Sequence, residues 1–425
     1  MRRTLVILLC LALSCAALAE GDSLWGMQVR AELVEPPAEA FDPALEQPRV
    51  AGISADGEKL LIVGVGGAPY LWDRGSGERL YLAPGNDAME EQLEMNWLGV
   101  IGKQPEEKRE AFRERLEKMY AKAPGDARLA RLSDPGLRIS SMMYPQGAQG
   151  DYMMLFNEKM SIFGLLDCRD GKWYCPEQGM PSLPVIDGRC VVFFRPEAML
   201  WDVESGETSP IDFGMPGWTL VYAAGLPDGS VCGALQDRSE IDKKNGQPTA
   251  LAILTPDGSR EEYALGKQKF GQAIGIFMTG GDGSRVVAFS QMTLERNRPF
   301  LIDRAAGTVS LLTHSEDGMR AIPLADCLDE NGIPVLSDED AAGVWIPLAG
   351  MRDGRLLAID MSRNELLLID LGTLETDVLL DDAGLSELDD TRMNLLAAPL
   401  PLTGNGLDTF ALRSLDKYLH LVSEG

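Results

Sequence analysis

Residues and motifs typical of catalytic or metal-binding sites are scarce in this chain of 425 residues. It has only two histidines, His314 and His420, and they lie far apart in the sequence. No Cys-x-x-Cys pair occurs, so neither a zinc knuckle nor a thioredoxin-type redox site is indicated. The Gly-x-Ser-x-Gly motif, the phosphate-binding loop and the dinucleotide fingerprint are also missing. We expect His314 to be a solvated turn residue and His420 to be packed in a strand, with no recognisable catalytic set.

Basic residues are too few to balance the acidic ones. The chain has 39 Lys and Arg against 65 Asp and Glu, a net charge of −26. Such a charge repels nucleic acid and anionic lipid, so we expect neither as a partner. After the N-terminus no apolar run reaches the roughly 20 residues that span a bilayer, so we expect no membrane span in the mature chain.

The N-terminus has the pattern of an export signal. Arg2 and Arg3 precede an apolar stretch over 5–18, and Ala17-Leu18-Ala19 offers the small residues that a signal peptidase recognises. The sequence therefore predicts a signal peptide over 1–19 and a secreted or cell-surface protein. Leu13-Ser14-Cys15 also resembles a lipoprotein box, although Ala12 departs from it. A lipid anchor at Cys15 is therefore the alternative.

Five cysteines remain after removal of such a signal, and an odd number leaves at least one thiol unpaired within the chain. Cys168 and Cys175 bracket Arg-Asp-Gly-Lys-Trp-Tyr, which is typical of a hairpin turn. We therefore expect a cross-strand disulfide between these two residues.

A two-part phrase returns along the chain. Asp-Gly is followed by an apolar run, and an apolar pair ending in Asp follows about 15 to 20 residues later. The clearest copy joins Asp56-Gly57 to Leu71-Trp72-Asp73. The other copies join Asp187-Gly188 to Leu200-Trp201-Asp202, Asp282-Gly283 to Leu301-Ile302-Asp303, and Asp353-Gly354 to Leu368-Ile369-Asp370.

These short strands in groups of about four predict an all-β protein, a β-propeller of seven blades over 50–425. Residues 20–49 form an N-terminal strand, over 23–33, and a linker; that strand is the candidate for closing the ring against the last blade. Over most of 50–423 the chain resembles bacterial WD40-like and quinoprotein-like propellers: Trp72-Asp73 and Trp201-Asp202 match the signature pair, while the earlier Gly-His pair is missing. A β-sandwich array is the rival fold.

One segment, 84–150, interrupts the ring after the first blade. Residues 105–123 are strongly helical, because Pro105 and two glutamates suit a helix start and Phe112, Leu116 and Tyr120 share one face. An apolar stretch with Trp97 precedes them. The helix either caps the ring or binds a ligand, and for the second case Trp97, Phe112, Leu116 and Tyr120 are the candidate binding residues.

A loop around Gly332 partly matches a calcium-binding loop. Asp329, Asn331 and Asp338 fall at the third, fifth and twelfth positions, but Cys327 stands where an Asp belongs. We therefore expect an ordinary loop here and no cofactor, with calcium as a weak alternative.

Two functions remain open. The first is an exported, non-catalytic propeller that binds a protein, peptide or glycan. The alternative is an extracytoplasmic hydrolase or lyase, lactonase-like, with a calcium or carboxylate site in the central channel. The fold cannot decide between them, because propellers host many unrelated activities.

Overall fold

The computed structural model describes residues 28–34, 36–43, 45–65, 68–120, 143–157, 162–239, 246–268, 276–279, 283–289, 299–315, 318–337, 345–351, 354–383, 411–413 and 418–424. Within these ranges β-strands predominate, as the short apolar runs predict, and α2 and α3 follow one another in a single insertion. Residues 1–19, Cys15 and Asp338 lie outside the described residues.

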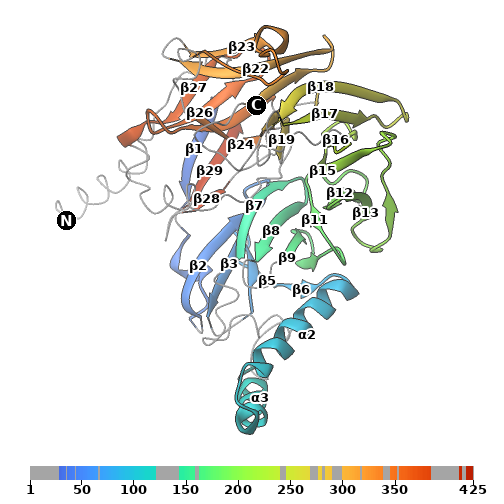
Figure 1. The fold of residues 1–425 in the computed structure, drawn as a ribbon. Coiled ribbons are helices and arrows are strands. Elements are labelled where there is room, and N and C mark those ends of the chain that lie inside the picture. The colour runs from blue at the N-terminus through green and yellow to red at the C-terminus, as the bar shows by residue number, and fades with distance from the viewer. Residues whose placement is uncertain are drawn as a thin grey trace, which may run out of the picture.

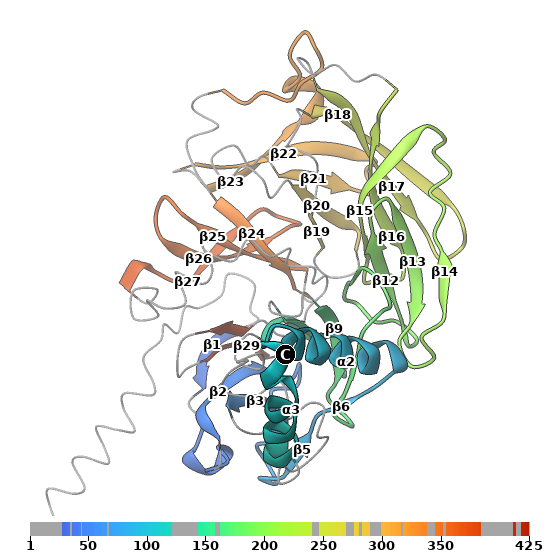
Figure 2. The same cartoon turned by 60° about the horizontal axis from the view of Figure 1, so that its bottom comes forward.

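Six sheets of four or five strands, which we call blades 1 to 6, follow one another around the molecule in chain order (Figures 1 and 2). Blade 1 contains β2 (Glu46–Ile53), β3 (Lys59–Val65), β4 (Tyr70–Asp73) and β5 (Arg79–Tyr81). Blade 2 contains β6 (Ala83–Pro84), β7 (Met143–Gln149), β8 (Tyr152–Asn157), β9 (Ile162–Asp167) and β10 (Lys172–Tyr174). Blade 3 contains β11 (Met180–Pro181), β12 (Arg189–Phe194), β13 (Glu197–Asp202) and β14 (Thr208–Pro210).

The remaining blades continue the ring. Blade 4 contains β15 (Trp218–Gly225), β16 (Val231–Asp237), β17 (Gln247–Leu254) and β18 (Arg260–Gln268). Blade 5 contains β19 (Ile276–Thr279), β20 (Arg285–Phe289), β21 (Phe300–Asp303), β22 (Thr308–Ser315) and β23 (Gly318–Pro323). Blade 6 contains β24 (Trp345–Gly350), β25 (Arg355–Asp360), β26 (Glu365–Asp370) and β27 (Thr376–Leu380).

The two ends of the chain meet in one further sheet, the closing sheet. β1 (Gln28–Val34) pairs antiparallel with β29 (Tyr418–Glu424), which also pairs with β28 (Ala411–Arg413). The N-terminal strand thus lies against the last strand, as expected of a strand that closes a ring. His420 lies in β29, the strand in which it was placed from the sequence.

The expected count of seven blades is wrong, because the described chain forms six blades of four or five strands. The segment assigned to a seventh blade, 392–423, contributes only β28 and part of β29 to the described residues. These two strands and β1 make the three-stranded closing sheet. Turn signals near the C-terminus could not distinguish a full blade from this closing sheet. One of the three strands of the closing sheet, β1, comes from the other end of the chain.

Hydrophobic contacts between neighbouring blades form the core. Leu71 of blade 1 and Leu166 of blade 2 belong to one buried cluster, Leu251 of blade 4 and Phe300 of blade 5 to another. A single antiparallel sheet leaves both faces open, and a ring covers each face with the next sheet. A single copy of the repeat therefore cannot fold alone, and the sheets fold together as a ring.

The final Asp of the repeated phrase ends the third strand of four blades, at Asp73, Asp202, Asp303 and Asp370. In each copy its Oδ1 accepts hydrogen bonds from the backbone N–H groups of the next turn, as from Ser76 at 2.7 Å. The turn bonds of the first three copies hold the pKa of these carboxyl groups below the usual value. The motif is therefore a turn-capping device.

A basic residue faces each of these aspartates on the neighbouring strand, within two residues of the Asp-Gly turn. The pairs in register are Lys59–Asp73, Arg189–Asp202, Arg285–Asp303 and Arg355–Asp370. Arg285 Nε lies 3.1 Å from Asp303 Oδ2, whereas Lys59 Nζ donates to the carbonyl of Cys168 in blade 2 at 2.8 Å. This third element of the phrase becomes evident only from the register of the strands.

The insertion contains two helices, α2 (Asp87–Gly102) and α3 (Glu106–Tyr120), rather than one. α3 matches the helix predicted over 105–123. α2 was not predicted, because apolar side chains lie on both of its sides and the sequence therefore shows no helical period. Met89, Leu93 and Ile101 are buried, and Met95 and Leu98 are exposed. No helix of the described residues has the length and apolar character to cross a membrane.

Candidate functional site

Asn86 holds the start of α2 on blade 2. Its side-chain Oδ1 accepts a hydrogen bond from the Met89 N–H at 3.1 Å, which is the N-cap geometry that satisfies a free donor of the first turn. Its Nδ2 donates to the carbonyl of Cys175 at 2.9 Å, just after β10. One side chain therefore both starts the helix and fixes it to the ring.

The inner side of α2 is part of the protein core. Met89 and Leu93 are buried in one cluster with Leu82, Trp173 and Cys175. Ile101, two turns after Leu93, is also buried. The capping role expected of the insertion therefore belongs to α2.

The outer side of α2 is exposed. Glu94 and Met95 come three and four residues after Glu91, and Leu98 comes four and three residues after them, so the four form one stripe along the helix. The exposed fractions of Met95 and Leu98 are 56% and 51%, the highest among the large apolar side chains described. We call these four residues the α2 stripe.

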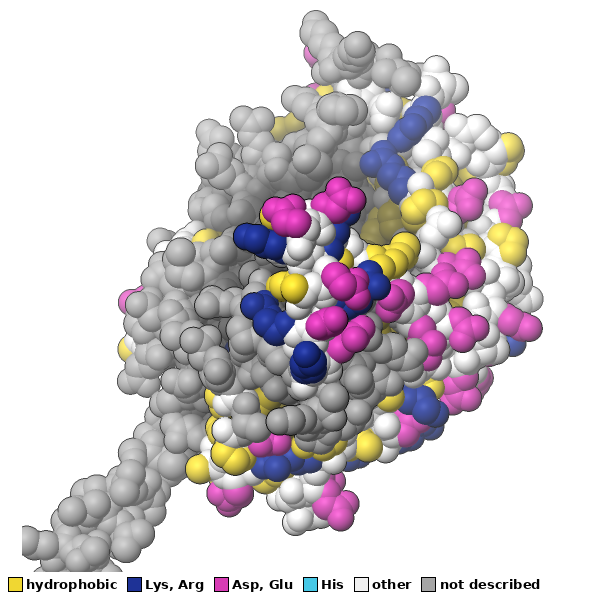
Figure 3. Space-filling model, turned by 90° about the horizontal axis from the view of Figure 1, so that it is seen from below, with side chains coloured by type: hydrophobic (Ala, Val, Ile, Leu, Met, Phe, Trp, Pro, Cys, Tyr) yellow, Lys and Arg dark blue, Asp and Glu magenta, His cyan; other side chains and the backbone are white. Residues whose placement is uncertain are grey.

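α3 projects from the ring beyond α2 (Figures 1 and 2). Arg109 of α3 donates to the carbonyls of Gln104 at 3.1 Å and Gly102 at 3.2 Å, so it caps the free end of α2. Phe112 is half-buried, with the Arg115 guanidinium 5.0 Å from its ring centre. Seen from below, acidic, basic and apolar side chains lie side by side where these helices project (Figure 3).

The four predicted binding residues are divided between the two helices. Trp97 lies in α2, and Phe112, Leu116 and Tyr120 lie in α3. The side chains of Trp97, Leu116 and Tyr120 are outside the described residues. Met95 and Leu98 were not among the predicted binding residues, because only the burial of the opposite side of α2 distinguishes them.

The expectation that His314 is a solvated turn residue is wrong. β22 continues through Ser315 and places His314 opposite Met319 within the strand pair, so the turn comes after it. His314 is buried, and its Nδ1 lies 3.0 Å from Oδ2 of the buried Asp360 in blade 6. Burial would raise the pKa of Asp360, but hydrogen bonds from His314 and from two backbone N–H groups hold it below its usual value. This pair links blades 5 and 6.

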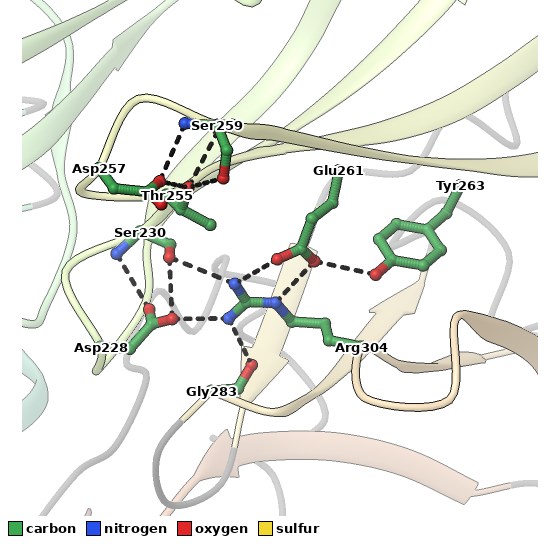
Figure 4. A network of polar contacts seen from close by, with 9 residues as sticks. All are labelled: Asp228, Ser230, Thr255, Asp257, Ser259, Glu261, Tyr263, Gly283 and Arg304. Atoms are coloured by element: carbon green, nitrogen blue, oxygen red, sulfur yellow. Dashed lines mark hydrogen bonds and ion pairs between the residues drawn. The ribbon is translucent and has the colours of Figure 1, made fainter.

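The most extensive polar network joins blades 4 and 5 around Arg304 (Figure 4). The guanidinium donates to Glu261 at 2.8 and 2.9 Å, to Asp228 at 2.7 Å, to the Gly283 carbonyl at 3.0 Å and to Ser230 at 3.4 Å. All five donors of Arg304 are thereby used. The network therefore works as a clamp between blades rather than as an open site.

This clamp also shifts the acidity of its members. The hydrogen bonds from Arg304 hold the pKa of Glu261 below its usual value, so the carboxylate stays ionised near neutral pH. Burial, together with the hydrogen bond that its hydroxyl donates to Glu261 at 2.9 Å, raises the pKa of Tyr263. Neither group is available to exchange a proton near neutral pH.

The expected disulfide between Cys168 and Cys175 is contradicted, because both thiols are free and buried. The hairpin register places Trp173 opposite Leu166, so Cys168 lies at the turn end of the hairpin and Cys175 at the other. Burial raises the pKa of both thiols to about 12, which keeps them protonated.

The loop that resembles a calcium site is an ordinary turn in its described part. Asp329 Oδ1 accepts the backbone N–H groups of Asn331 at 2.8 Å and Ile333 at 2.9 Å. Within the described ranges, no three His, Cys, Asp or Glu side chains gather to hold a metal ion.

No protein-family model and no curated protein matches this chain. Among solved structures it is similar to the β-propeller domain of Cps50 (Swd1) from Myceliophteria thermophila, at 11% identity and a TM-score of 0.36, over 82% of this chain and 88% of that one. It is similar to a streptogramin B lyase at 13% identity and a TM-score of 0.32, over 67% and 94%. It is also similar to an oligogalacturonate lyase in complex with manganese at 9% and 0.30, over 65% and 86%.

The ring of sheets makes the protein a β-propeller, and no specific family is shown for it. Structural similarities with such low identities and TM-scores support no conclusion about function. The function must therefore be argued from the site itself.

Proposed function

We propose that the protein is an exported, non-catalytic β-propeller that binds a protein, peptide or glycan partner through its helical insertion. The observation that carries the proposal is the division of α2 into two sides. Met89 and Leu93 belong to the core, while Met95 and Leu98 are exposed on the same helix. A rigidly anchored helix with an exposed apolar side is a usual form of recognition surface.

The titratable groups that join the blades support a binding role. His314 is engaged with Asp360, and Glu261 and Asp228 are engaged with Arg304. These contacts join blades and lower the pKa of Asp360 and Glu261 rather than tuning either group toward neutral pH. The alternative, a hydrolase or lyase with a calcium or carboxylate site in the channel, gains no specific observation from the described residues.

Site-directed photo-crosslinking tests the proposal in cells that express the full chain. A photo-reactive amino acid replaces Leu98, and a matched variant carries it at Val378, which is 47% exposed on the outer strand of blade 6. We expect a crosslinked product from position 98 and none from position 378. Folded variants that give no product at 98, or the same products at both positions, would refute it.

Export is tested separately by fractionation and N-terminal sequencing. We expect the protein outside the cytoplasm, starting after Ala19 or at a lipidated Cys15. Recovery of the intact chain from the cytoplasm alone would contradict this part of the proposal.

A further inference from the structure

The α2 stripe combines two kinds of side chain in a fixed order. Glu91 and Glu94 lie in the second turn of α2, and Met95 and Leu98 follow on the same side of the helix. The carboxylates are adjacent to the apolar pair because residues three and four apart are neighbours on a helix. A partner that covers the apolar pair therefore also meets negative charge.

The net negative charge of the whole molecule disfavours acidic partners. The chain has a net charge of −26, so a second copy would bring like charges together, most closely where stripe meets stripe. The Asn86 bonds and the buried Met89 keep the anchored part of α2 in place, so a partner adapts to the helix rather than the reverse.

We infer that the α2 stripe binds a basic amphipathic segment of a partner protein, in which apolar side chains alternate with Lys or Arg. Its apolar side chains cover Met95 and Leu98, and its cations pair with Glu91 and Glu94. Charge complementarity sets the partner class and the rate of encounter, and burial of the apolar pair holds the complex. This inference rests on the proposed function and adds the chemistry of the partner.

Binding of two labelled helical peptides to the purified mature chain tests the inference, with fluorescence anisotropy as the readout. One peptide is built from leucine and lysine, and the other has glutamate in place of each lysine. We expect only the lysine peptide to bind, more weakly as salt rises because surface ion pairs are screened. Equal binding of both peptides would overturn the inference.

Two double variants and their matched controls locate the contact. M95S/L98S removes the apolar pair, and V335S/V378S removes two similarly exposed apolar residues elsewhere. E91Q/E94Q and E197Q/E207Q each remove two exposed carboxylates, so they change the net charge equally. We expect the Kd of the lysine peptide to rise about tenfold in the α2 variants and less than about twofold in the controls.

Each other outcome has a definite meaning. Equal weakening by E91Q/E94Q and E197Q/E207Q would show that bulk charge attracts the peptide and would overturn the inference. A dimer of the wild-type chain that M95S/L98S converts to a monomer, measured by analytical ultracentrifugation, would assign the stripe to a second copy and overturn it as well. Crosslinks from position 98 to an acidic or neutral segment would refute the basic partner while leaving the binding function intact.

Discussion

Removal of the Arg304 side chain should destabilise the junction of blades 4 and 5 more than any other single change at the surface turns. Only 11% of this side chain is exposed, and it holds Asp228 and Glu261 at 2.7 and 2.8 Å. In Arg304→Ala both carboxylates lose their cation. Breaking a fully buried pair costs about 3–5 kcal/mol. Because both carboxylates are 30% exposed, water compensates in part, and we expect a loss of about 2–3 kcal/mol.

Equilibrium unfolding in urea at pH 7 measures this loss. Arg74→Ala is the matched control, because Arg74 occupies the equivalent position in blade 1 but is exposed, and among the contacts described its side chain donates only to the Gly57 carbonyl. A change within about 0.5 kcal/mol is expected there. Arg304→Lys should recover only part of the loss, since an ammonium cannot make the two parallel bonds to Glu261.

The dependence on pH provides a second check. Arg304 lowers the pKa of Glu261 in the folded state, so this carboxylate contributes stability above its unfolded pKa of about 4.3 and loses it as the pH falls through the folded value. The difference between wild type and Arg304→Ala should therefore shrink below about pH 4. A loss under about 1 kcal/mol at pH 7, or a difference that stays constant to pH 3, would refute the clamp.

Three further predictions follow from the burial pattern. Met89→Ala should lower the free energy of unfolding by about 2–4 kcal/mol in urea titrations, because it opens a cavity, while Met95→Ala should leave it unchanged; equal effects would contradict the two-sided helix. The lowered pKa of Asp360 means that wild type loses stability as the pH falls below about 4 and this carboxylate takes up a proton. In Asp360→Asn this loss, measured in thermal melts, should be smaller, and an unaltered pH profile would exclude the contribution of Asp360. Cys168 should react with a thiol reagent only after unfolding, as judged by mass spectrometry, and a Cys168–Cys175 crosslink in the unreduced protein would contradict the free thiols.

Features encoded within a few residues could be predicted from the sequence. The turn at Asp56-Gly57 depends on neighbours within a few residues, and it is present. α3 was predicted for the same reason, because its start signal and charge pattern are local. Repetition of such local signals was enough to indicate a propeller.

Features that depend on distant partners could not be predicted. His314 is buried because Asp360 of another blade faces it, and nothing near His314 in the sequence indicates this. The sequence does not indicate which side of α2 is exposed. Met89 and Leu93 are buried in one cluster with Trp173, and this leaves Met95 on the exposed side. Cys168 and Cys175 looked paired by spacing, but the hairpin register separates them.

The pairing of β1 with β29 also governs the order of events during synthesis. The chain is made from its N-terminus, so Gln28–Val34 emerges long before its partner Tyr418–Glu424. Contacts between segments so distant in sequence form slowly, because a loop of almost the whole chain must close first. The ring therefore stays open until Tyr418–Glu424 is free to pair with Gln28–Val34. Deletion of the final seven-residue strand should accordingly trap an open, aggregation-prone chain whose six blades have no closing sheet.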